Sequence, residues 1–154
     1  AIQQEVDKGR QVVFLCEGDP LFFGSFAYLL DRLAAKNRCE VVPGITSVNA
    51  ASSALQLPLT MLRESLAVIS GRHSDQQLMA ALQQYDSVVI MKAGQARQRI
   101  LKALVASKRS HEARYIEYIG RENQRMLSDM DALADEPGPY FSLFVVIKTE
   151  RDRS

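Results

Sequence analysis

The sequence predicts an α/β fold with two lobes. Over most of the 154 residues, short apolar runs rich in β-branched residues alternate with segments whose apolar residues recur at helical spacing. A stretch with a central proline, Gln56 to Glu64, interrupts this alternation, and we place the boundary between the lobes there. The predicted domains are therefore an amino-terminal lobe, residues 1–57, and a carboxyl-terminal lobe, residues 58–154.

The first lobe is predicted to contain two strands and two helices. Gln11 to Leu15 (QVVFL) is typical of a strand covered on both faces, and helical spacing follows from Phe22 to Ala35. Cys39 to Val42 predicts a second short strand, after which Thr46 can cap a helix from Ser47 to Leu55. This order predicts parallel strands joined by a right-handed crossover.

The second lobe is predicted to continue the alternation and then to end in strands. Two helices are expected, one capped by Ser74 or Asp75 and one from Ala96 to Ala106. The expected strands have apolar or alternating patterns and are Leu66 to Ser70, Ser87 to Met91, Arg114 to Ile119, Gln124 to Leu127 and Tyr140 to Ile147.

Composition and charge exclude several classes of protein. A formal net charge of +1 gives no electrostatic footprint of a nucleic-acid binder, so no nucleic-acid partner is predicted. The apolar runs are short and no basic-then-apolar leader opens the chain, so we expect no membrane partner and a cytoplasmic location. With 47% hydrophobic residues, the chain can bury a sizeable core.

The cysteines and histidines do not predict a metal site. Cys16 and Cys39 lack C-x-x-C or metal-ligand spacing and lie in or beside apolar segments, so we expect buried free thiols in a reducing cytosol. His73 and His111 are far apart and have no nearby carboxylate pattern typical of zinc sites.

The first candidate site is the stretch CEGDPLFFGS, from Cys16 to Ser25. Gly18 at the end of a predicted strand would let a ligand approach the backbone closely. Glu17 and Asp19 would repel phosphate and suit a ligand with an ammonium, a sulfonium or ribose hydroxyls. The alternative is a simple turn, with Asp19 as helix cap and Pro20 in the first helical turn.

Two further stretches have a similar layout. In VVPGITSVNAASSA, from Val41 to Ala54, a strand ends in glycine and a helix of small residues follows, which suits either close ligand approach or tight packing on a sheet. In VIMKAG, from Val89 to Gly94, a strand ends at Met91 and Lys92 follows. Either residue could contact a ligand, and the alternatives are a core methionine and a solvated lysine.

Taken in this order, the three stretches resemble the tetrapyrrole methylase family, S-adenosylmethionine enzymes that methylate corrin and related precursors. CEGDPLFFGSFAYLLDRL is similar to the family's G-D-P loop and following helix, VVPGITSVNAASSALQLPL to its P-G-[IV]-[TS]-S motif, and VVIMKAG to its strand ending in methionine. The resemblance covers nearly the whole chain. It implies a two-lobed fold with a truncated, parallel α/β amino-terminal lobe and a mixed-sheet carboxyl-terminal lobe.

The resemblance also implies a cofactor, S-adenosyl-L-methionine, and a set of residues that bind it. Carried over one by one, the cofactor-binding residues are Glu17, Gly18, Asp19, Phe22, Thr46, Ser47, Met91 and Gly120. A homodimer is the expected assembly.

The implied reaction is a direct displacement in cobalamin biosynthesis. An electron-rich ring carbon of the tetrapyrrole attacks the cofactor's methyl group, and no general base can be named from the sequence. Because the substrate carries many carboxylates, Arg72, Lys92 and Arg121 are candidate substrate-binding residues, with solvated surface as the alternative reading.

One departure from the family is large. The family opens with a strand and a G-x-G-P-G-D loop that nothing here matches, and AIQQEVDKGRQ is typical of a helix end with Gly9 as its stop. We therefore expect a fragment that is inactive alone. The alternatives are a family member with another ring position or an RNA or protein substrate, or a binding or dimerisation module without turnover.

Overall fold

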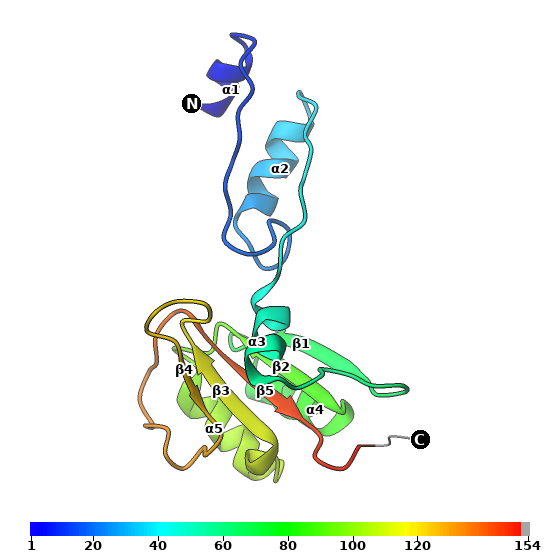
Figure 1. Ribbon diagram of the computed structural model, residues 1–154, viewed down its shortest axis with the longest axis vertical. Helices are drawn as coiled ribbons and strands as arrows, with labels where there is room; N and C mark the ends of the chain where they lie inside the picture. Colours follow the sequence, from blue (N-terminus) through cyan, green and yellow to red (C-terminus); the bar gives the residue numbers. More distant parts are fainter. Residues whose placement is uncertain (152–154) are drawn as a thin grey trace. The chain divides into compact units, whose positions relative to one another are not determined.

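The computed structural model describes residues 1–151, which form two compact units: residues 1–49 are unit 1, and the described residues from Ala50 on are unit 2 (Figure 1). Helix α3, Ser47–Leu55, spans the division between them. The lobe boundary after residue 57 stays a prediction. Each unit is described by itself below.

Unit 1 contains two helices before α3. Helix α1, Ile2–Val6, ends ahead of Gly9, whose φ of +76° matches the predicted helix stop. Helix α2, Phe26–Ala34, begins at Phe26 rather than at the predicted Phe22. Its start is delayed because the preceding residues turn around Asp19, whose carboxylate accepts a hydrogen bond from the Leu21 backbone N–H at 2.9 Å.

The two strands predicted for the first lobe are absent from unit 1, all of which the structure describes. Residues 11–15 and 39–42 are coil, drawn in Figure 1 as the blue and cyan segments beside α2. A strand needs a hydrogen-bonded neighbour, and neither segment has a ladder partner among the described residues. Their apolar side chains are consequently exposed, to 81% at Val13 and 87% at Leu15.

The two thiols are free, as expected, but the prediction that both are buried is wrong. Cys16 is half-buried and Cys39 is exposed. The cause is the same as for the missing strands, because each cysteine adjoins a segment that no sheet covers.

Unit 2 is built on a mixed sheet, as expected. Within the described part of the unit, five strands have the order β1-β2-β5-β3-β4. Their bounds are Leu66–Ser70 (β1), Ser87–Met91 (β2), Ala113–Glu117 (β3), Arg125–Leu127 (β4) and Ser142–Ile147 (β5). Strands β1 and β2 are parallel, and β5 lies antiparallel between β2 and β3. The five predicted strands are thereby confirmed to within about two residues.

Two helices pack on this sheet and on each other, and a short 3-10 turn, η1, Ser110–Glu112, follows them. Helix α4, Asp75–Gln84, starts with a capping box in which the Ser74 hydroxyl accepts from the Gln77 N–H, and α5 spans Arg97–Ala106. Fully buried residues of both helices meet alternate residues of the central strands, among them Leu78, Ile100, Ile90, Tyr115 and Phe144. This core fixes the strand ends, and with them the loops that carry the predicted site residues.

The linker ahead of β1 is tied to the far end of the unit. Arg151 forms a bidentate ion pair with Glu64 and donates to the Pro58 carbonyl at 2.7 Å. The hydrogen bonds from the Arg151 side chain lower the pKa of the Glu64 carboxyl. Asp86 likewise accepts from the backbone N–H and the hydroxyl of Ser65, at 2.9 Å each. These contacts tie the linker to the segment after β5 and to the residue before β2.

Candidate functional site

In unit 1, two of the predicted motifs lie against each other. The Asp19 carboxylate accepts hydrogen bonds from the backbone N–H of Leu21 and, at 3.0 Å, from that of Gly44. A Cβ atom at Gly44 would lie only 2.1 Å from the carbonyl oxygen of Gly18, which itself has a φ of +75°. The G-D-P loop and the P-G segment therefore touch through backbone that only glycine permits.

This contact gives Asp19 a defined charge state. The N–H of Gly44 is the largest influence, followed by that of Leu21, and together they lower the pKa of the Asp19 carboxyl. The loop therefore presents a fixed negative charge at neutral pH. Gly44 stands at the strand end of the second candidate stretch but is not among the predicted cofactor-binding residues.

The other predicted residues of unit 1 lie in the same two segments. Glu17 is exposed, and Phe22 is half-buried with its ring centroid 5.1 Å from that of Phe23. Thr46 does cap α3, because its hydroxyl oxygen accepts from the Asn49 N–H at 3.3 Å, and Ser47 is the first residue of that helix. The unit thus brings the G-D-P loop and the start of α3 together through one short connection.

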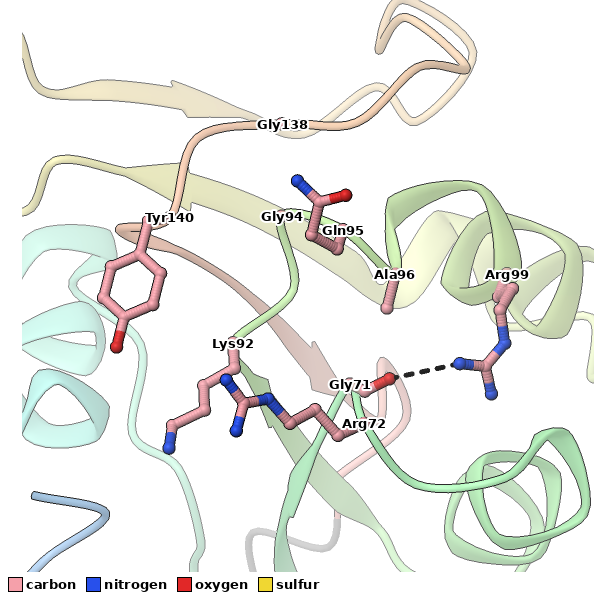
Figure 2. A pocket seen from close by; sticks show the side chains of 9 residues that line it. All are labelled: Gly71, Arg72, Lys92, Gly94, Gln95, Ala96, Arg99, Gly138 and Tyr140. Atoms are coloured by element: carbon pink, nitrogen blue, oxygen red, sulfur yellow. Dashed lines mark hydrogen bonds between the residues drawn. The ribbon is translucent and has the colours of Figure 1, made fainter. Parts of the chain in front are cut away.

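Unit 2 contains a cavity of about 240 Å³ at one edge of its sheet (Figure 2). The loops after the carboxyl ends of parallel strands β1 and β2 form two walls, and the segment ahead of β5 forms a third. This is the edge at which open α/β sheets bind ligands. The lining residues are Gly71, Arg72, Lys92, Gly94, Gln95, Ala96, Arg99, Gly138 and Tyr140.

The walls depend on close backbone contacts. The Gly138 N–H donates to the Gly94 carbonyl at 2.9 Å, and the Ala93 N–H donates to the Ser142 carbonyl at 3.3 Å. A Cβ atom at Gly94 would lie 2.4 Å from the carbonyl oxygen of Pro139. The loop after β2 and the segment ahead of β5 are therefore in direct backbone contact.

The cavity is lined by cations. Arg72, Lys92 and Arg99 contribute three positive charges, and none of the lining residues is acidic. Arg99 is anchored outside the cavity by Asp75 at 2.7 Å and by the His73 carbonyl at 2.7 Å. Figure 2 shows Arg72 and Lys92 projecting from the two strand-end loops. The arrangement suits an anionic group.

Lys92 is also in an unusual backbone conformation. Its φ of +54° lies in the left-handed region, which is uncommon for a residue with a side chain. Such conformations cost about 1–3 kcal/mol and gather at ligand sites. Hydrogen bonds on either side stabilise this conformation. The Gly71 N–H donates to the Met91 carbonyl, and the Ala93 N–H donates to the Ser142 carbonyl.

The site residues predicted in unit 2 do not all lie at this cavity. Arg72 and Lys92 line the cavity, whereas Met91, Gly120 and Arg121 are not among its lining residues. Met91 ends β2, and Gly120, with a φ of +75°, donates its N–H to the Gln124 side chain at 2.7 Å. Arg121 lies 4.2 Å above the centroid of the Phe141 ring.

Sequence reasoning missed Gln95, Arg99 and Tyr140 as lining residues. A signal existed for Gln95, which follows the singled-out VIMKAG stretch directly. Tyr140 was predicted as the first residue of the last strand, but its place at the cavity depends on the strand order.

The described residues, 1–151, contain neither a candidate metal cluster nor a candidate membrane span. No group of three or more histidine, cysteine, aspartate or glutamate side chains there could hold a metal ion. None of the helices in this range combines the length and the apolar character needed to cross a membrane.

The chain belongs to the tetrapyrrole (corrin/porphyrin) methylases, since residues 1–133 match that family. Within it, the chain is similar to the precorrin-2 C(20)-methyltransferase of a Sinorhizobium species, with 38% identity over 95% of this chain and 59% of that protein. It is also 37% identical to the cobalt-precorrin-2 C(20)-methyltransferase of Salmonella typhimurium, over 96% of this chain and 63% of the relative. The chain thus spans about three-fifths of the length of these two curated relatives.

A solved structure supports the fold. The uroporphyrin-III C-methyltransferase from Thermus thermophilus, in complex with S-adenosyl homocysteine, superposes with a TM-score of 0.69 at 23% identity. The match covers 95% of this chain and 70% of that one.

Proposed function

We propose that this chain takes part in the S-adenosylmethionine-dependent methylation of a tetrapyrrole, precorrin-2 or its cobalt-containing counterpart, at C20 in cobalamin biosynthesis. The observation that carries the proposal is the identity of 37–38% to two relatives with these activities over nearly the whole chain. The homodimer implied by the resemblance and the cytoplasmic location expected from the short apolar runs belong to the same proposal.

The residues of unit 1 fit the cofactor. Asp19 is ionised at neutral pH, the Gly44 and Leu21 amides lower the pKa of its carboxyl further, and a carboxylate suits the ammonium and sulfonium charges of S-adenosylmethionine. At Gly44 the backbone packs on the Gly18 carbonyl too closely for a side chain, and this contact holds the loop that carries Asp19 in place. When bound, the cofactor would supply an electrophilic methyl group.

The residues of unit 2 fit the substrate. The cavity has three cationic side chains and no acidic one, and a tetrapyrrole with carboxylate arms could place one arm there. Arg72 and Lys92 would bind and orient that arm, and Tyr140 would cover it. In this proposal the protein's task is to hold the ring carbon and the methyl group in line and to exclude water, which can supply several kcal/mol of the barrier.

The cofactor half of the proposal is tested by calorimetry with S-adenosyl homocysteine on the purified protein. Asp19→Asn removes the charge while conserving the size of the side chain, and we expect at least a tenfold loss of affinity. Unchanged affinity would remove Asp19 from the cofactor site.

The substrate half is tested by methylation assays with metal-free precorrin-2 and with its cobalt-containing counterpart. A charge-assisted hydrogen bond is worth about 1.5–3 kcal/mol, so Lys92→Gln should raise KM for the tetrapyrrole about tenfold or more. Lys102→Gln on the exposed side of α5 is the matched control and should leave KM unchanged. The assays use the full-length protein, and turnover of neither substrate by its unaltered form would reject C20 methylation.

A further inference from the structure

A buried polar cluster lies directly behind the cavity of unit 2. Arg97 is the first residue of α5, and the residue is only 5% exposed. Its Nη2 donates to the Tyr115 hydroxyl at 2.5 Å and lies 3.6 Å from a Glu117 carboxylate oxygen. The Tyr115 hydroxyl in turn donates to that oxygen at 2.8 Å.

This cluster supports the third wall of the cavity. A Cβ atom at Gly138 would lie 2.0 Å from Nη2 of Arg97, so the Gly138 backbone packs directly against the guanidinium. Further along the wall, the Ser142 hydroxyl donates to the Pro139 carbonyl at 2.7 Å. The only side chain of this wall that lines the cavity is Tyr140, between these two anchored points.

Stability alone does not account for a buried arginine here. Its Nε is buried and has no hydrogen-bond partner within residues 1–151, and a buried unsatisfied donor costs about 1–3 kcal/mol. Replacing buried ion pairs with apolar side chains is often neutral or stabilising. A cation at this position therefore calls for a role beyond holding the core together.

We propose that Arg97 is a positioning residue: its contacts with Tyr115 and Glu117 fix the guanidinium, and the guanidinium holds the Gly138 to Ser142 segment against the loop after β2. The segment then keeps Tyr140 at the cavity. The effect of Arg97 on the order of this segment can be measured whether or not the proposed function holds. The expected effect on turnover rests on the proposed function.

Hydrogen exchange of the Gly138 amide, which donates to the Gly94 carbonyl, measures this order directly. The matched pair of variants is Arg97→Met and Arg109→Met. Arg109 is another largely buried arginine, paired with Glu112 and donating to the carbonyls at the end of α4, away from the cavity. Both variants should unfold at lower temperature than the unaltered protein.

Only Arg97→Met should lower the protection of the Gly138 amide, by at least tenfold relative to the amides of β5. If the two variants change that ratio equally, Arg97 is merely a structural residue and the proposal is wrong. Should Arg97→Met fail to fold, Tyr115→Phe keeps the ring and removes only the hydroxyl, and the same loss at Gly138 is expected. An unchanged ratio in a folded Tyr115→Phe would equally overturn the proposal.

The methylation assay provides the second readout. Arg97→Met and Tyr115→Phe should raise KM for the tetrapyrrole at least fivefold, while kcat changes less than twofold. If the unaltered protein turns over no tetrapyrrole, the proposed function fails, and the exchange ratio still decides the role of Arg97.

Discussion

Segments of similar apolar sequence adopt different secondary structure in the two units. QVVFL in unit 1 and SVVIM in unit 2 have nearly the same apolar content. The first is coil with Val13 81% exposed, and the second is strand β2 with Val89 fully buried. Strand β2 is paired on both sides, by β1 and by β5. Neighbouring strands, rather than composition, decide which of the two segments becomes part of a sheet.

Burial follows the same division. Among residues 1–47, all of which the structure describes, no residue is buried, whereas the sheet and helices of unit 2 share one continuous core. Unit 1 is instead held by hydrogen bonds such as those of Asp19 and by ring contacts such as Phe14 with Phe26. The comparison predicts that equal substitutions have unequal effects in the two units.

The largest difference is expected for phenylalanine. Phe144 is fully buried against Tyr115, and its replacement by alanine should cost about 3–5 kcal/mol of unfolding free energy. Phe14 is 45% exposed, so Phe14→Ala should cost less than about 1 kcal/mol. Urea unfolding followed by circular dichroism measures both. Equal losses would contradict the contrast between the units.

A smaller difference is expected at the helix caps. The Ser74 hydroxyl accepts from the Gln77 N–H, and Ser74→Ala should cost about 1 kcal/mol. Ser25 precedes α2 without any side-chain cap bond, so Ser25→Ala should change the stability by less than about 0.5 kcal/mol. Thermal unfolding of the two variants measures both changes in stability. A larger loss of stability for Ser25→Ala would show that the Ser25 side chain caps α2.

The smallest effect is expected in the pH dependence of the Asp19 contact. A lowered pKa means that the contact is complete above the ordinary aspartate value of 3.8 and is lost as the pH falls through the lower folded value. The NMR shift of the Gly44 amide should therefore titrate with a midpoint below 3.8 and should not titrate in Asp19→Asn. A midpoint at or above 3.8 would mean that the Gly44 and Leu21 amides do not stabilise the carboxylate.

The sequence predicted unit 2 better than unit 1 for a physical reason. Periodicity and capping residues such as Ser74 are local signals, and they located every helix and strand of the second unit that the prediction named. The same signals were wrong for QVVFL, because pairing is not local. Likewise, Arg72 and Lys92 follow visible strands, but Tyr140 joins them only because β5 lies beside β2.

The position of β5 also affects how the protein can be made. Although it is the last of the five strands along the chain, it lies at the centre of the sheet, between β2 and β3. Until residues 142–147 have been synthesised, the β1–β2 pair and the β3–β4 pair therefore have no strand to join them. The sheet is completed only after β5 has been synthesised, and until then the edges of β2 and β3 lack their partner strand.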